Sequence, residues 1–368
     1  MKKNDIILAH GLDYKKMAKK VLETANLTEL IGDKQKKVAL KPNLVTTTPP
    51  SAGATTHAEI LEGALEYLRE NGFSDVTVME GSWVGDRTQD VLDVVGYRPI
   101  LKKYDVPFVD LQKDSWTEYN AQGMKIKLCD QAHQTDFMIN LPVLKGHCQT
   151  LVTCALKNNK GVIPNSEKRR FHTMGLHKPI AHLNTIARND FILVDNICGD
   201  LDFEEGGNPV EMNRILGFRD PVLCDAFVCE TMGYSPEDVP YIPLAEELGV
   251  GSTDLKNANL IYVNPPQSRE QSLPPTRRVQ SLSRYAAPSD ACSACYGSLI
   301  YALARLDDSG RLKKSLPKIA IGQGYRDKTG EIGVGQCTSC FAKTLQGCPP
   351  KAIDILKFLS ENWKQPHL

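Results

Sequence analysis

The sequence predicts an α/β protein: a body built on a mostly parallel, doubly wound sheet, followed by a smaller cysteine-rich α/β module. Three observations support this. Short apolar strand patterns alternate with helical patterns through residues 1–264, which is typical of parallel sheets covered by helices. Proline and serine then interrupt the pattern at residues 265–290, and five of the eleven cysteines follow within residues 292–348.

The strands expected in the body are short and largely apolar. They span residues 37–43, 75–80, 106–109, 125–128, 137–141, 191–194 and 260–263. Between the first two we expect a helix from a cap at Thr55 or Thr56 to a stop at Asn71, because the apolar residues from Ile60 to Leu68 form one stripe. We therefore assign residues 1–264 to the α/β body.

The stretch 265–290 predicts a linker, because its proline- and serine-rich composition does not suit a packed core. The metal-binding module is then expected at residues 291–368. Its expected elements are a helix at 299–306, a strand at 318–321, a glycine-rich run at 322–335 and a last helix at about 352–363.

Composition argues against several classes of function. With 44 basic and 44 acidic residues the net charge is zero, so no overall attraction to nucleic acid or membranes is expected. No apolar stretch approaches the roughly 18 residues of a membrane span, and the N-terminal apolar run is too short for a signal peptide. We therefore expect a cytoplasmic protein, in which paired cysteines bind metal rather than form disulfides.

A basic, histidine-rich segment at residues 145–182 is the strongest candidate for ligand binding. It holds seven lysines and arginines against one acid, and four of the eight histidines. Such a field suits a small anionic molecule or cofactor, whereas the alternative is a solvated charged face. Nucleic acid is not expected, because few aromatic residues are interleaved for base stacking. The candidate catalytic residues are Lys145, His147, Lys157 and His172.

Other candidate ligand-binding residues lie in the same segment or at the expected carboxyl ends of strands, where open α/β sheets place their sites. They are Lys41, Asn43, Lys160, Lys168, Arg169, Arg170, Asp195 and Asp225. For the two aspartates, capping a helix is the commoner alternative role.

The C-terminal cysteines predict a metal centre. Cys292 and Cys295, like Cys337 and Cys340, stand at the Cys-x-x-Cys spacing found in zinc and iron–sulfur sites. These four cysteines would complete the tetrahedral coordination of a structural zinc, and Cys348 would then not be a ligand. We expect a 4Fe-4S cluster that includes Cys348, with zinc as the alternative.

Four motifs of the body resemble the family catalogued as domain of unknown function 362, over residues 36–263. They are Lys41-Pro-Asn-Leu-Val45, Asn140-Leu-Pro-Val-Leu-Lys-Gly-His147, Ala155-Leu-Lys-Asn-Asn-Lys-Gly161 and Arg219-Asp-Pro-Val-Leu-Cys-Asp225. The resemblance implies no particular reaction, because the family has none assigned. It does imply that an iron–sulfur module can follow the body, since members are often joined to one of ferredoxin type.

The tail departs from the ferredoxin pattern. Its Cys-x-x-Cys, Gly-x-Cys and Gly-Cys-Pro-Pro motifs resemble the cluster-binding motifs of nickel–iron hydrogenase small subunits and the related quinone-reductase subunit. The resemblance implies that Cys292, Cys295, Cys337 and Cys348 hold one 4Fe-4S cluster. The short interval after Cys337 leaves Cys340 as an alternative third ligand.

The predicted function is that of an iron–sulfur protein, an electron-transfer or redox enzyme that acts on an anionic ligand and works with a redox partner protein. Two alternatives remain open. One is a non-redox enzyme that uses the lysines and histidines for acid–base catalysis, and the other is a cofactor-binding protein. In either alternative the cysteine module is structural and holds zinc.

Overall fold

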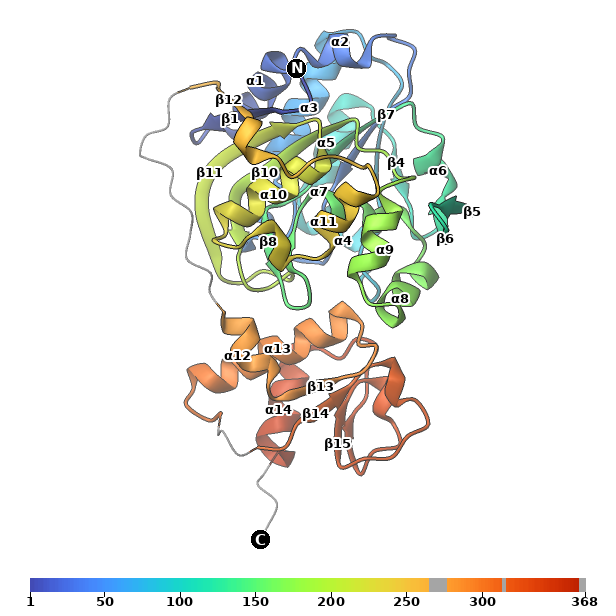
Figure 1. Cartoon of the computed structure of the whole chain (residues 1–368), viewed down its shortest axis with the longest axis vertical. Coiled ribbons are helices and arrows are strands. Elements are labelled where there is room, and N and C mark those ends of the chain that lie inside the picture. The colour runs from blue at the N-terminus through green and yellow to red at the C-terminus, as the bar shows by residue number, and fades with distance from the viewer. Residues whose placement is uncertain (265–276, 313–315, 364–368) are drawn as a thin grey trace.

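The structure is a computed structural model that describes residues 1–264, 277–312 and 316–363. Figure 1 shows two lobes, with the body above and the C-terminal module below it. Among the described residues, no helix is long and apolar enough to cross a membrane.

Eight strands of the body form one sheet, in the order β12-β1-β11-β10-β7-β2-β3-β4. Their bounds are β1 Asp5–His10, β2 Val38–Pro42, β3 Val76–Glu80, β4 Phe108–Asp110, β7 Phe137–Leu141, β10 Phe191–Asp200, β11 Pro209–Phe218 and β12 Asn259–Tyr262. Strand β11 is antiparallel to both of its neighbours, and the other pairs are parallel. The predicted mostly parallel α/β sheet is confirmed.

Helices cover both faces of this sheet. Side chains alternate between the two faces along each strand, so Ile7 of β1 belongs to one hydrophobic core and its neighbours Ile6 and Leu8 belong to the other. The first core takes in α1 Tyr14–Thr24, α2 Leu27–Ile31, α3 Ala58–Glu70, α4 Thr88–Val94 and α5 Tyr97–Tyr104. The second takes in α6 Asp130–His133, α7 Ala155–Asn158, α8 Asn165–Thr173, α9 His177–Leu183, α10 Pro221–Thr231 and α11 Tyr241–Glu247.

Two details of the body differ from expectation. The strand expected at 125–128 is present as β6 Met124–Cys129, but it pairs with β5 Trp116–Ala121 in a separate two-stranded sheet and does not join the central sheet. Alternation of buried and solvent-facing residues along β6 explains this, since strands of the central sheet are buried on both faces. The hydroxyl of Thr56 does not cap α3, because it donates to the carbonyl of Leu141 at 2.7 Å.

The remaining short elements lie mostly in loops. They are β8 Lys145–His147 and β9 Leu151–Thr153, which pair with each other, and the 3₁₀ turns η1 Pro50–Ala52, η2 Asn159–Val162, η3 Pro236–Asp238, η4 Leu255–Asn257, η5 Gln323–Tyr325 and η6 Gln336–Thr338.

The C-terminal module is a second parallel sheet, in the order β13-β14-β15-β16. Its strands are β13 Ala286–Pro288, β14 Ile319–Ile321, β15 Ile332–Val334 and β16 Lys343–Leu345, and its helices are α12 Arg278–Ser283, α13 Ser293–Asp308 and α14 Ala352–Asn362. Of the expected linker 265–290, residues 265–276 lie outside the described residues. The rest contributes α12 and β13, and because β13 pairs with β14, this part belongs to the module.

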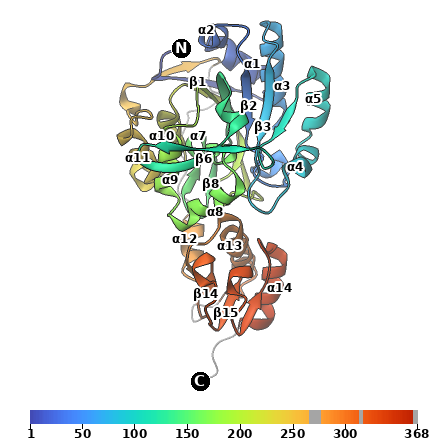
Figure 2. The same ribbon diagram turned by 90° about the vertical axis from the view of Figure 1, so that its right-hand side faces the viewer.

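The two lobes are in direct contact (Figure 2). Phe203 of the body is fully buried within the module's hydrophobic core, and its ring lies 5.5 Å from that of Tyr301 on α13. Gln149 of the body accepts a 2.8 Å hydrogen bond from the Ser293 hydroxyl and donates a 3.0 Å bond to the Ala291 carbonyl. The start of α13 is therefore fixed against the body's basic segment.

Candidate functional site

A cavity of about 70 Å³ lies where the body meets the module. The ends of β2 and β3, the α7–η2 segment, α8 and the first residues of α13 supply its walls. Its polar lining residues include Asn43, Glu80, Trp83, Lys157, Lys160, Lys168, Arg169, His172, Glu204 and Cys292. The basic segment predicted from the sequence therefore does line a cavity at the carboxyl edge of the sheet.

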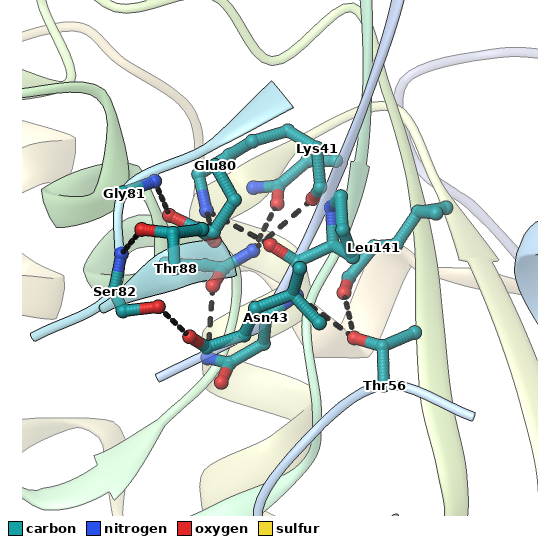
Figure 3. A network of polar contacts seen from close by, with 12 residues as sticks. Lys41, Asn43, Thr56, Glu80, Gly81, Ser82, Thr88 and Leu141 are labelled. Atoms are coloured by element: carbon teal, nitrogen blue, oxygen red, sulfur yellow. Dashed lines mark hydrogen bonds and ion pairs between the residues drawn. The ribbon is translucent and has the colours of Figure 1, made fainter. Parts of the chain in front are cut away.

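Behind the cavity, Lys41 and Glu80 form a buried ion pair at the ends of β2 and β3 (Figure 3). The Lys41 ammonium lies 2.5 Å from Glu80 Oε2, and the side chains are 0% and 4% exposed. A Cβ on Gly161 would overlap Glu80 Oε1 at 1.8 Å, so glycine is required for this approach. Lys41 itself is not among the cavity-lining residues, and its charge is neutralised within the protein.

A second buried ion pair joins Lys157 to Glu204, with Lys157 Nζ 2.5 Å from Oε1. Burial opposes the charge of Glu204, but Lys157 and His147 hold its pKa well below the usual value. His147 Nε2 is 2.9 Å from Glu204 Oε2, and its Nδ1 accepts from the backbone N–H groups of Gln149 and Thr150. The proton of the neutral ring therefore lies on Nε2, and burial lowers the pKa of His147 to about 4.

Lys145 and Lys168 also donate to protein oxygens. Lys145 Nζ donates to the carbonyls of Ala54 at 2.6 Å and Glu204 at 3.0 Å. Lys168 Nζ donates to the carbonyls of Gly81 and Ser82, each at 2.8 Å. Burial lowers the pKa of both lysines to about 8. These two cations fix loops next to the cavity, and Lys145 is not among the cavity-lining residues.

Four donor groups of the cavity lining have no hydrogen-bond partner among the residues that the structure describes. They are the Lys160 ammonium, the Arg169 guanidinium, Trp83 Nε1 and His172 Nδ1. Burial and the nearby charge of Lys157 lower the pKa of Lys160 to about 7. Because every one of these groups can donate, the cavity suits a ligand that carries hydrogen-bond acceptors and negative charge.

Three predicted ligand-binding residues lie elsewhere. Arg170 bonds to Glu167 on the same helix, with Nε 2.9 Å from Oε2. Asp225 is fully buried and accepts from the backbone N–H of Ala155 at 2.7 Å, at the start of α7. Asp195 binds His57. Asn43 does line the cavity, and its side-chain amide donates to Asn158 at 2.9 Å.

The C-terminal cysteines meet at a second cavity, at the carboxyl edge of the small parallel sheet. Cys292, Cys295, Cys337 and Cys348 all line it, and Cys340 does not. Cys340 is exposed on the turn after Cys337. Segments that follow β13, β14, β15 and β16 surround the four sulfurs, and three of the lining residues are glycines with positive φ: Gly322, Gly335 and Gly347.

The two cavities are neighbours. Cys292 and Arg169 line both of them, and Gln323 beside the sulfur cavity donates to the Arg169 carbonyl at 3.3 Å and to Cys292 Sγ at 3.6 Å. Burial, together with the other cysteines, raises the pKa of Cys292 and of Cys295. A positive species bound among the four sulfurs would therefore favour their thiolate forms.

Sequence reasoning missed three residues of the first cavity: Glu80, Glu204 and Trp83. Glu80 ends β3, so the rule that selected Lys41 at the end of β2 could have found it. Glu204 lies in the loop between β10 and β11 and Trp83 in the loop after β3, and no spacing or repeat in the sequence marks either one.

Comparison with known proteins places the body in a family. The chain is 25% identical over 228 residues to the thylakoid-associated protein sll1697 of Synechocystis sp., a match that covers 59% of this chain and 69% of that protein. The lactate racemase apoprotein from Thermoanaerobacterium thermosaccharolyticum is a distant structural match, with a TM-score of 0.40 and 16% identity. That match covers 58% of this chain and 54% of the racemase chain, so the chain spans about half of its length. Residues 38–230 match the family described as domain of unknown function (DUF362), and the chain belongs to this family.

Proposed function

We propose that this protein is an iron–sulfur redox protein that acts on a small anionic ligand bound between its two lobes. One observation carries the proposal: the cavity lined by four cysteines shares Cys292 and Arg169 with the cavity lined by Lys160 and His172. Thiol groups and the side-chain donors of Lys160, Arg169 and His172 therefore lie on adjoining surfaces.

The donor set of the module fits a 4Fe-4S cluster. Cys292, Cys295, Cys337 and Cys348 would supply four thiolates. A closed zinc site would bring its sulfurs to about 3.8 Å from one another, given bonds of about 2.3 Å. The zinc alternative uses Cys340, which does not line this cavity, whereas the cluster uses Cys348, which does. This difference supports the cluster. When bound, such a cluster supplies one-electron transfer.

The body's own residues would bind and orient the ligand. Arg169 offers a planar, permanently charged donor, and Lys160 offers a charge that is lost near neutral pH. Val45, Trp83 and Val84 give the cavity an apolar side. These features favour an anion with an apolar part, such as a small carboxylate, whose negative end lies near Arg169 and Lys160. Lys160, as a protonated amine, could also supply a proton to the ligand.

The test is the metal content of single cysteine variants purified without oxygen. We expect about four iron and four acid-labile sulfide per chain in the parent protein, and loss of most of both in Cys337→Ala and in Cys348→Ala. Cys340→Ala is the matched control and should keep the parent content, because Cys340 does not line the sulfur cavity. About one zinc per chain that depends on Cys340 and not on Cys348 would contradict the proposal.

A second candidate function is non-redox acid–base catalysis on the same anion. The pKa of Lys160, lowered to about 7, favours it, because a general acid–base group works best near its own pKa. In that case turnover would survive Cys348→Ala and would be lost in Lys160→Met. In the redox proposal, Cys348→Ala abolishes turnover.

A further inference from the structure

A third cluster of chemically active side chains joins β10 to the start of α3, and none of its members lines either cavity described above. Asp195, His57 and Cys198 stand in a row. Asp195 Oδ2 is 2.8 Å from His57 Nδ1, and His57 Nε2 is 3.9 Å from Cys198 Sγ. A carboxylate, an imidazole and a thiol in this order are the components of an activated sulfur nucleophile.

His57, which immediately precedes α3, brings the row together, because it contacts both Asp195 and Cys198 of β10. In a regular strand, residues three apart point to opposite faces. Here the pairing of β10 with β11 shifts register between Asn196 and Cys198, and the extra residue of this bulge lies on β11, between Glu211 and Arg214. A bulge bends the sheet locally and increases its twist, so the regular alternation does not apply at this point.

Asp195 fixes the orientation of the imidazole. Its Oδ2 accepts from the backbone N–H of His57 at 2.7 Å as well as from the ring Nδ1, and its Oδ1 accepts from the N–H of Ile197 at 3.1 Å. With Nδ1–H held by the carboxylate, Nε2 is the ring atom left to exchange a proton with the thiol.

Electrostatics favours a charged ring at this position. Burial alone would lower the pKa of His57, but the charge and hydrogen bond of Asp195 outweigh it and raise the pKa to about 10. The other titratable groups around the row are Tyr14 of α1, Glu59 of α3 and Glu211 of β11. An imidazolium beside a sulfur stabilises the thiolate. Burial raises the pKa of Cys224 and Cys229, and within the described ranges no histidine is hydrogen-bonded to either.

We propose that Cys198 is a nucleophilic thiol, held by His57 and Asp195, and that it is a covalent modification site for small uncharged carbon electrophiles. The proposal is independent of the iron–sulfur function. The thiol proton passes to His57 Nε2 when the ring is neutral, and to water when the ring is already charged. The thiolate then attacks carbon, a sulfur–carbon bond forms, and the leaving group departs with its bonding electron pair.

Access to Cys198 is narrow, which explains the restriction to small reagents. Cys198 is 6% exposed and the side chain of His57 is 12% exposed. The Pro50 carbonyl of η1 lies 3.5 Å from Cys198 Sγ. In the thiol form, Cys198 can donate a hydrogen bond to this carbonyl.

The test is alkylation of the folded full-length chain by iodoacetamide, followed by peptide mass spectrometry of each cysteine. An ordinary thiol with a pKa of about 8.5 reacts roughly tenfold faster per pH unit between pH 6 and 8. We expect the rate at Cys198 to change less than about threefold over that range. Exposed Cys340 serves as the ordinary thiol in the same sample, and buried Cys224 as the inaccessible one.

The matched variant is His57→Gln, which keeps a side chain of similar size without the imidazole. We expect it to slow the alkylation of Cys198 at pH 7 by at least tenfold and to restore the steep pH dependence. Should this variant fail to fold, the pH profile of the parent protein decides alone. A parent Cys198 that reacts no faster than Cys224, or that follows the pH profile of Cys340, overturns the proposal.

Discussion

Two sets of cations lie at the cavity between the lobes or directly behind it, and they differ in whether the protein already neutralises them. Lys41 and Lys157 each lie 2.5 Å from a buried carboxylate, and Lys145 donates to backbone carbonyls. The side-chain cations of Lys160 and Arg169 make no hydrogen bond or ion pair with any residue that the structure describes. The first set therefore maintains the fold of the cavity, and the second is available to a ligand.

The difference shows that a basic residue indicates a ligand site only if no carboxylate or carbonyl of the protein already binds its charged group. A buried charge without a partner is costly, so the cations at a cavity that have no partner within the protein are the ones to test for ligand binding. The following predictions test this division, beginning with the largest effect.

Glu80→Gln should be the most damaging change to the set behind the cavity. It leaves Lys41 buried without its counter-ion, and removing one partner of such a pair typically costs about 3–5 kcal/mol of unfolding free energy. Urea denaturation measures this loss. The matched control is Lys20→Gln, which removes an exposed pair with Glu23 and should cost less than about 1 kcal/mol. Equal costs in the two variants would show that Lys41 does not depend on Glu80.

The sequence indicated where this site lies better than it indicated which residues form it. Strand patterns ending near Lys41 and Leu141 placed the site at the carboxyl edge of a parallel sheet, and the structure has β2 and β7 there. The roles of the lysines depend on Glu80 and Glu204, which are 39 and 47 residues from their partners. Such pairings are created by tertiary structure and leave no local pattern.

Arg169 and Arg170 show the same limit at the scale of one helix turn. The sequence made them equivalent members of one basic run, but successive residues of a helix point about 100° apart. Arg169 lines both cavities, whereas Arg170 pairs with Glu167. The sequence does not give the first residue of α8 or the rotation of this helix about its axis. It therefore could not show which of the two arginines lines the cavity.

This pair of arginines provides the second prediction. Arg169→Ala should weaken the binding of benzoate, used as a small carboxylate probe, by about tenfold or more, because a hydrogen bond to a charged group contributes about 1.5–3 kcal/mol. Arg170→Ala is the control on the same helix and should change the affinity less than twofold. Isothermal titration of both variants measures the difference. Equal losses would mean that only the general field of the segment attracts the anion.

The smallest expected effect is a dependence of anion affinity on pH, set by Lys160. Its pKa is lowered to about 7, so the ammonium is mostly charged at pH 6 and mostly neutral at pH 8.5. A neutral amine still donates a hydrogen bond but no longer attracts a carboxylate by charge. We therefore expect the affinity for benzoate to fall about fivefold, or about 1 kcal/mol, as the pH rises across this range. Lys160→Met should bind benzoate weakly at both pH values and with little change between them. If the parent protein and Lys160→Met show the same pH dependence, another group titrates, and Lys160 belongs with the neutralised cations behind the cavity.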